Sequence, residues 1–143
     1  MIGAELRART RQFAFDIIDL CLQLGHDGLG KLVRGQLLRC GTSVGANHRA
    51  SNRSRSDREF VARTSVVVEE ADESEFWLDV LETRRYGPID SVKRLRQEAD
   101  ELCAILNASR ATAARRIQER KKEKKRSSKQ SNKKASDNKP DEM

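Results

Sequence analysis

The sequence has few aromatic residues, few turn-forming residues and no long apolar run. Aromatic residues make up 4% of the chain, and eight glycines and two prolines are too few for the many turns of a β-sandwich. No segment approaches the ~18 consecutive apolar residues that a membrane-spanning helix needs. These absences favour a helical protein without a membrane partner. The length of 143 residues suits one domain.

The chain also lacks the residue clusters that build metal sites. Its three cysteines, Cys21, Cys40 and Cys103, are far apart and form no CxxC or Cys/His cluster, so we expect no zinc. All three fall on apolar helical faces, where a free cysteine usually serves as a small core residue. The first eleven residues carry four charges and no apolar signal-peptide segment, which predicts a cytoplasmic protein.

Charge is abundant and strongly segregated. Residues 110–143 hold 13 Lys/Arg and five Asp/Glu, a net charge of +8, whereas residues 1–109 hold 16 Lys/Arg and 17 Asp/Glu, a net charge of −1. Within the body, residues 34–63 hold seven arginines against two acids, and residues 69–82 hold seven acids and no base. Segregation of this kind concerns binding partners rather than fold.

Apolar residues recur at spacings of three and four in four segments, which predicts four amphipathic helices. They are expected over about residues 5–24, 29–51 and 56–86, and from about residue 88 to beyond residue 114. Ser56 and Glu59 form a capping box at the start of the third helix. Gly41 and Gly45 leave two interpretations open: a loop near residues 41–43, or a helix that a neighbouring helix approaches closely. The apolar stripe continues through Val44, which favours the helix.

Four such helices, joined by loops of about three to six residues, give an all-α, up-down-up-down bundle over residues 1–118. From about Lys121 the chain is rich in Lys, Ser and Asn and almost free of apolar residues. Residues 119–143 are therefore expected to form a disordered tail.

The third helix carries more apolar residues than one core can use. This excess is explained either by a broad core stripe or by packing between subunits. The second explanation predicts self-association. The candidate oligomer-interface residues are Val61, Val66, Val68, Trp77 and Val80.

The sequence contains no motif of an enzyme. His26 and His48 have no Ser or Cys partner at a motif spacing, and there is no P-loop, no GxGxxG and no Glu-x-x-His pair. We therefore expect neither catalysis nor a cofactor or metal. A solvated or salt-bridged helix face explains the acids at 69–82.

The basic residues indicate binding instead, because arginine is the bidentate partner of phosphate and a lysine-rich segment attracts any polyanion. The alternatives are a solubilising loop that pairs with acids of the third helix or of a neighbouring subunit, and a solubilising tail. The candidate nucleic-acid-binding residues are Arg39, Arg49, Arg53, Arg55, Arg58 and Arg63 near the junction of the second and third helices, and Lys121, Lys122, Lys124, Lys125 and Arg126 in the tail.

The same residues resemble a known family. The similarity covers about residues 10–107 and is carried by residues 36–39, 41–47, 49, 52–56, 60, 68–74 and 77–78. They resemble the bacterial 23S ribosomal RNA intervening-sequence proteins, whose superfamily includes Avd, the accessory variability determinant of diversity-generating retroelements. His48 stands where the motif usually has Tyr, Ala50 and Ser51 replace an acidic residue, and the lysine-rich tail lies outside the shared part.

The resemblance implies a homopentameric barrel of parallel-aligned subunits. For Avd-like members it implies a basic surface that contacts a reverse transcriptase and its RNA. The leading hypothesis is a non-enzymatic, oligomeric protein that binds RNA or DNA through the phosphate backbone. The alternative is a structural scaffold of the intervening-sequence type, which binds a partner protein through the third helix and its acids.

Overall fold

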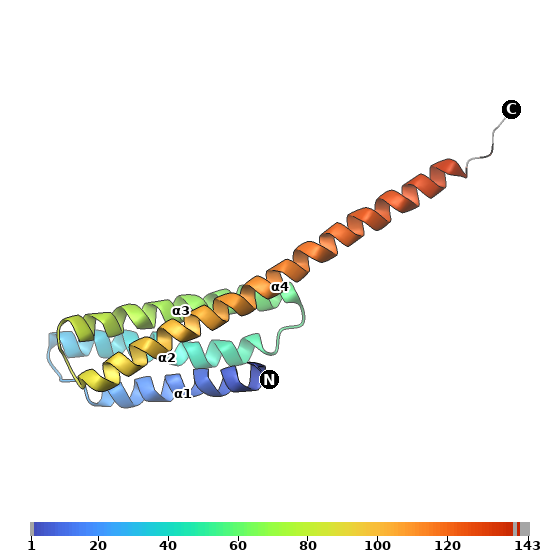
Figure 1. The fold of residues 1–143 in the computed structure, drawn as a ribbon. Coiled ribbons are helices and arrows are strands. Elements are labelled where there is room, and N and C mark those ends of the chain that lie inside the picture. Colours follow the sequence, from blue (N-terminus) through green and yellow to red (C-terminus); the bar gives the residue numbers. More distant parts are fainter. Residues whose placement is uncertain (1, 139, 141–143) are drawn as a thin grey trace.

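The structure is a computed structural model that describes residues 2–138 and residue 140, apart from the side chain of Ile2. Over that part of the chain it has four α-helices: α1 (Ile2–Leu22), α2 (Gly28–Ser51), α3 (Asp57–Thr83) and α4 (Ile89–Asp137). The connecting segments 23–27, 52–56 and 84–88 have five residues each, so consecutive helices run antiparallel (Figure 1). The predicted up-down-up-down four-helix bundle is confirmed.

The core lies where the four apolar stripes meet. Ile17 of α1, Leu37 of α2, Leu78 of α3 and Leu102 of α4 are fully buried, as their spacing predicts. Burying a side chain of this size stabilises the fold by about 1.5–3 kcal/mol. Phe60, the first stripe residue of α3, is only half-buried because it lies at the end of the bundle.

The cysteines are core residues, as predicted. Cys21 and Cys40 are buried, Cys103 is half-buried, and all three are free thiols. Burial raises the pKa of Cys21 and of Cys103 to about 11, and it raises the pKa of Cys40 as well. The three thiols are therefore protonated at neutral pH and are poor nucleophiles.

Gly41 and Gly45 lie inside α2, where α1 packs closely against it. A Cβ atom at position 41 would lie 2.7 Å from Ile17 Cγ2, and one at position 45 would lie 3.1 Å from Ala14 Cβ. These distances are shorter than van der Waals contacts. The close-approach interpretation of the two glycines is confirmed, and the loop interpretation is wrong.

Replacing Gly41 by alanine is therefore expected to destabilise the protein by about 1–2 kcal/mol, because overpacking against Ile17 outweighs the gain in helix propensity. Gly35 is the matched control, since a Cβ there meets nothing within 4 Å. Gly35→Ala is expected to stabilise the helix by about 0.5–1 kcal/mol. Urea unfolding followed by circular dichroism measures both. Equal stability changes in the two variants would contradict the close approach.

The structure corrects the prediction of a disordered tail. Residues 119–137 continue α4 without a break, and residues 139 and 141–143 lie outside the described residues. The prediction considered only burial, which is absent here. However, Lys, Arg, Glu and Gln are good helix formers, and extending a helix that packing has already nucleated costs little.

We call residues 114–137 the arm. Ala113 is the last buried residue of α4, and the arm projects beyond the bundle on the side where α1 begins (Figure 1). Over the described part of the chain, no helix has an apolar stretch long enough to cross a bilayer.

Candidate nucleic-acid interface

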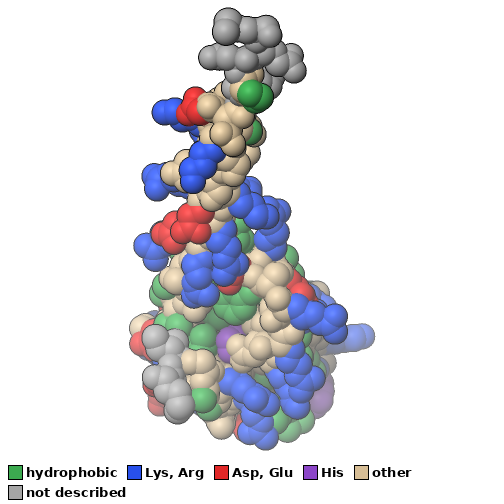
Figure 2. Space-filling view, turned by 90° about the vertical axis from the view of Figure 1, so that its right-hand side faces the viewer, with side chains coloured by type: hydrophobic (Ala, Val, Ile, Leu, Met, Phe, Trp, Pro, Cys, Tyr) green, Lys and Arg blue, Asp and Glu red, His purple; other side chains and the backbone are tan. Residues whose placement is uncertain are grey.

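A cleft of about 900 Å³ opens at the end of the bundle from which the arm emerges. We call it the mouth. It is lined by the start of α1, the end of α2, the loop 52–56, the start of α3, residues 105–112 of α4 and the base of the arm. Figure 2 looks onto this end and shows Lys and Arg side chains around the hollow and along the arm. The mouth thus brings together basic residues that are far apart in the sequence.

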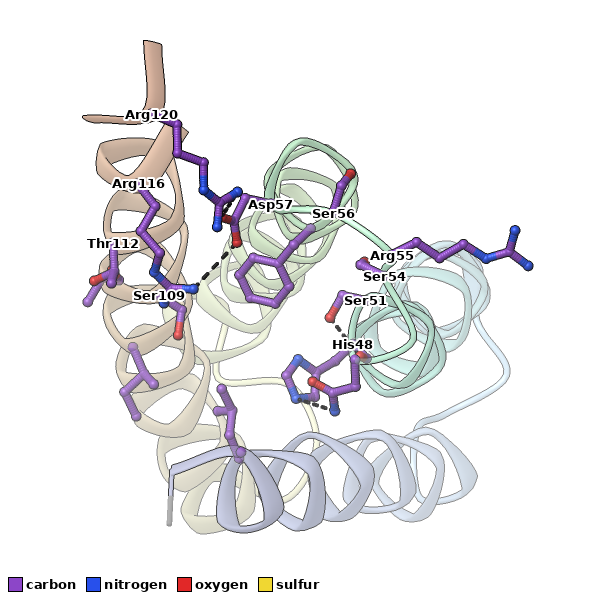
Figure 3. Close-up of a pocket in the computed structure, with 16 residues that line it drawn as sticks. His48, Ser51, Ser54, Arg55, Ser56, Asp57, Ser109, Thr112, Arg116 and Arg120 are labelled. Atoms are coloured by element: carbon purple, nitrogen blue, oxygen red, sulfur yellow. Dashed lines mark hydrogen bonds and ion pairs between the residues drawn. The ribbon is translucent and has the colours of Figure 1, made fainter. Parts of the chain in front are cut away.

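Four of the predicted arginines lie at or beside the mouth with free guanidinium groups. Arg49 is in the last turn of α2, Arg53 and Arg55 are in the loop 52–56, and Arg58 is in the first turn of α3. All four are exposed. Within residues 2–138, their guanidinium groups make no ion pair or hydrogen bond, and Arg55 points outward from the cleft (Figure 3). Their charges are therefore available to a partner.

The cap of α3 fixes the course of this loop. Ser56 Oγ accepts a hydrogen bond of 3.1 Å from the backbone N–H of Glu59, as the capping box predicts. The Glu59 carboxylate accepts from the backbone N–H of Arg55, at 3.2 Å, rather than from that of Ser56. The two bonds hold the arginine-bearing loop against the start of α3.

Two of the predicted arginines have structural partners instead. Arg39, about three turns before the end of α2, forms ion pairs with Glu70 and Glu73 of α3. Arg63 forms an ion pair of 2.6 Å with Glu59 and donates a hydrogen bond of 2.8 Å to the carbonyl of Ala50. Arg39 therefore lies away from the mouth, and Arg63 ties the start of α3 to the end of α2.

The acids of α3 are largely neutralised inside the bundle. Arg39 pairs with two of them, and Arg96 of α4 pairs with Glu75, Asp79 and Glu82 at 2.7–3.3 Å. The hydrogen bonds that Arg96 donates to Glu75 and Glu82 raise its pKa further. The interpretation of these acids as a salt-bridged face is confirmed, and the four arginines at the mouth do not take part in it.

The lysines and arginine predicted in the tail are all in the arm. Lys121, Lys122, Lys124, Lys125 and Arg126 are exposed and helical, and they follow one another around α4. The correction from tail to helix changes their geometry, because their charges now lie along a straight rod that starts at the mouth (Figures 1 and 2).

Sequence reasoning missed Arg116 and Arg120, which form the wall of the mouth at the base of the arm. Arg116 Nη1 lies 3.4 Å from Asp57 Oδ1. Arg120 Nη1 lies 2.9 Å from Asp57 Oδ2. The two groups form an ion pair, but among the described residues Asp57 Oδ2 accepts no hydrogen bond. Both guanidinium groups are more than half exposed, so they keep N–H donors for a ligand.

A signal for these two residues is present in the sequence. The core stripe of α4 runs through Leu102 and Leu106, and the same spacing continues to positions 109, 113, 116 and 120. Ala113 still continues the apolar stripe, but Ser109, Arg116 and Arg120 replace apolar residues. A stripe that changes from apolar to basic marks the point where a helix leaves its core, so the residues beyond it face the mouth.

His48 is one of the residues that line the mouth, and it was also missed. It continues the α2 stripe through Cys40 and Val44, and its side chain is 3% exposed. Figure 3 shows His48, Ser51 and Ser54 on one side of the cleft and Arg116 and Arg120 on the other. The Asn52 amide nitrogen lies 3.4 Å from His48 Nε2, and within the described residues Nδ1 has no partner. Burial, and secondly the charge of Arg7, lowers the pKa of His48 below its ordinary value of 6.5, so the ring is neutral at pH 7.

The lowered pKa of His48 predicts a loss of stability at acidic pH. Below pH 6.5 the unfolded chain binds a proton more readily than the folded protein, so the stability present at pH 7.5 is expected to fall as the pH decreases toward 5. Thermal melting at several pH values measures this. His48→Gln is expected to reduce the pH dependence, and His26→Gln, in an exposed loop, is the matched control. An unchanged pH dependence in His48→Gln would assign the effect to other groups.

The predicted interface residues of α3 divide into two groups. Val68, Trp77 and Val80 pack partly against the core and Val61 is half-buried, whereas Val66 is 42% exposed. Phe76 next to Trp77 is 54% exposed and contacts the Trp77 ring edge-on. Part of the apolar excess thus belongs to a broad core stripe, and part faces solvent.

The fold and the mouth define an all-helical bundle with a basic end and a basic helical arm. The model of the 23S rRNA-intervening sequence protein family matches residues 4–108, and the chain belongs to this family. A similar solved structure is that of a protein with unknown function from the S23 ribosomal protein family of Bacteroides thetaiotaomicron. It is 25% identical, has a TM-score of 0.68 and covers 78% of this chain and 99% of its own. No curated protein matches the chain. The arm lies beyond the residues that the family model matches.

Proposed function

We propose that this protein binds nucleic acid without catalysing a reaction, and that the arm and the mouth act together as one phosphate-binding surface. The main support is the distribution of charge on α4. Residues 115–137 hold 11 Lys/Arg and three Asp/Glu, and they leave the bundle beside four unpaired arginines. At 1.5 Å per residue the arm extends roughly 36 Å, which is about one turn of a nucleic-acid duplex.

The ion pairs of α3 favour this function over the scaffold hypothesis. A scaffold that used the acids of α3 to hold a partner protein would need those acids to be free. Five of the seven acids at 69–82 are already paired with Arg39 or Arg96. Unpaired bases of the described residues are concentrated at the mouth and along the arm.

Salt dependence tests the proposal. Filter-binding titrations of the full chain with duplex RNA and with duplex DNA are expected to show an affinity that decreases about 10³-fold or more between 50 and 200 mM salt, as for six to ten phosphate contacts. Comparison of the two duplexes identifies the preferred nucleic acid. An affinity that stayed constant over this range would refute phosphate-driven binding.

We also propose that the protein self-associates through the exposed apolar residues of α3, as a homopentamer. Val66 and Phe76 support this because each leaves about half of a large apolar side chain in water. Several arms on one assembly would multiply the phosphate contacts. Light scattering is expected to give the mass of five chains, and Phe76→Glu is expected to lower it. A strict monomer at micromolar concentration would contradict self-association.

The finer form of the proposed function is that of Avd, in which the nucleic acid is the RNA of a retroelement and a reverse transcriptase is the protein partner. Its support is the resemblance of the matching residues between 36 and 78 to that superfamily. A reverse-transcriptase gene with template and variable repeats beside the coding sequence is the expected finding. A location inside a ribosomal RNA gene would instead favour the intervening-sequence type.

A further inference from the structure

The mouth contains more than a phosphate-binding surface requires. Phosphates need exposed cations, yet the cleft below Arg116 and Arg120 is also lined by apolar side chains. Leu6 of α1 is buried, and Phe60 of α3 and Ile105 of α4 are half-buried. The cleft has an open volume of about 900 Å³, and it combines these few apolar side chains with hydroxyl, amide, imidazole and basic groups, which suits a ligand that has both a flat apolar face and a polar edge.

Two polar atoms of residues that line the cleft have neither a hydrogen bond nor an ion pair within the described residues. They are His48 Nδ1 and Ser54 Oγ, and both are buried. A buried polar atom without a partner is energetically unfavourable, so a ligand that supplies the missing partner gains affinity.

The tautomer of His48 indicates the kind of partner. In the orientation of the structure, the Asn52 amide donates to Nε2, so the single proton of the neutral ring is on Nδ1. Nδ1 is therefore a donor, and the Ser54 hydroxyl can donate or accept. Carbonyl oxygens and ring nitrogens on the edge of a nucleobase are acceptors of the required kind.

We propose that the mouth receives one unpaired base of a single-stranded segment, whose flanking phosphates contact Arg116 and Arg120. The base would lie against Phe60, and its edge would face His48 and Ser54. A base within a duplex is paired and stacked, so it can enter a cleft only at the energetic cost of unpairing and unstacking, which an unpaired base avoids in large part. This inference rests on the proposed function, and it predicts a preference for single strands that phosphate contacts alone do not produce.

Filling the cleft tests the inference. Ala108 lines the cleft and is exposed, so Ala108→Phe occupies space there without disturbing the core. Ala104→Phe is the matched control, because Ala104 is exposed on α4 about one turn earlier and does not line the cleft. The ligands are a short single-stranded RNA and the duplex that it forms with its complement.

The wild-type chain is expected to bind the single strand more tightly than the duplex, a preference that phosphate contacts alone do not produce. Ala108→Phe is expected to weaken single-strand binding about 10-fold and leave duplex binding and the salt dependence unchanged, since base–aromatic stacking has about this effect. Ala104→Phe is expected to change neither. Equal losses for both ligands in Ala108→Phe, or no loss, would overturn the base site while the phosphate surface stands. If the wild-type chain bound neither ligand, the proposed function itself would fail.

A second measurement identifies what enters the cleft. Uridine 5′-monophosphate is expected to shift the ¹⁵N resonances of the His48 ring, and inorganic phosphate at the same concentration is not. Equal shifts with both would show that the mouth binds only an anion, which would overturn the proposal. The absence of a shift would also overturn it. If Ala108→Phe lowered the mass measured by light scattering, the occupant of the cleft would be a second copy of the chain rather than a base.

Discussion

Replacing Lys121, Lys122, Lys124 and Lys125 of the arm together by glutamine is expected to lower the affinity for a nucleic-acid duplex about 10-fold to 100-fold at about 100 mM salt. The slope of log affinity against log salt is expected to decrease by about 3 to 4, because each lost phosphate contact contributes about 0.9. Glutamine is as good a helix former as lysine, so the arm is expected to stay helical.

A matched variant separates local contacts from total charge. Lys31, Arg84, Arg85 and Lys93 are four exposed bases at the opposite end of the bundle. Their replacement by glutamine changes the net charge by the same amount and is expected to change the affinity less than 3-fold, because screening limits charge effects to about 10 Å at 0.1 M salt. Similar losses in both variants would show that overall charge, and not the arm, determines binding.

Local patterns in the sequence predict the bundle well, because each helix buries one continuous stripe. The spacing that runs through Ile17, Leu37, Leu78 and Leu102 identifies the residues that become fully buried. Even Gly41, which propensity alone disfavours in a helix, is explained by the contact with Ile17. Such features depend on the spacing of apolar residues and on the small size of glycine, and both can be read from one sequence.

The arm could not be predicted in the same way. Its residues bury nothing, and burial was the only criterion that the sequence argument applied to them. Whether such a segment is helical depends on propensity and on the packed helix that precedes it. The charge of Lys121 to Arg126 was therefore recognised correctly, but its arrangement along a rod that starts at the mouth was not.

Only part of the candidate site could be predicted, because the sequence does not show which side chains meet in the fold. The charge count identifies Arg53 and Arg55, which the structure leaves unpaired, but it includes Arg39 equally. Composition cannot distinguish a paired from an unpaired guanidinium, because the partners Glu70 and Glu73 are more than 30 residues away in the chain. Arg116 and His48 were missed because each stripe was followed only to its last apolar residue, Leu106 in α4 and Val44 in α2.

Because Arg53 and Arg55 are unpaired and Arg39 is paired, their replacement is expected to have different effects. Arg53→Glu with Arg55→Glu is expected to weaken duplex binding about 10-fold to 100-fold, because two contacts are lost and two repulsive charges face the phosphates. The folding stability is expected to change little, since neither guanidinium has a partner within the described residues. Thermal melting and filter binding of the same samples measure the two effects separately.

Arg39→Glu is the control with the opposite expectation. The substitution places a third carboxylate beside Glu70 and Glu73, so it is expected to lower the melting temperature and leave the affinity of the folded protein nearly unchanged. If Arg39→Glu weakened binding as much as the double variant, the interface would extend along the face between α2 and α3. If the double variant bound normally, the arm alone would hold the nucleic acid. The pair of variants therefore determines which part of the basic surface contacts the ligand.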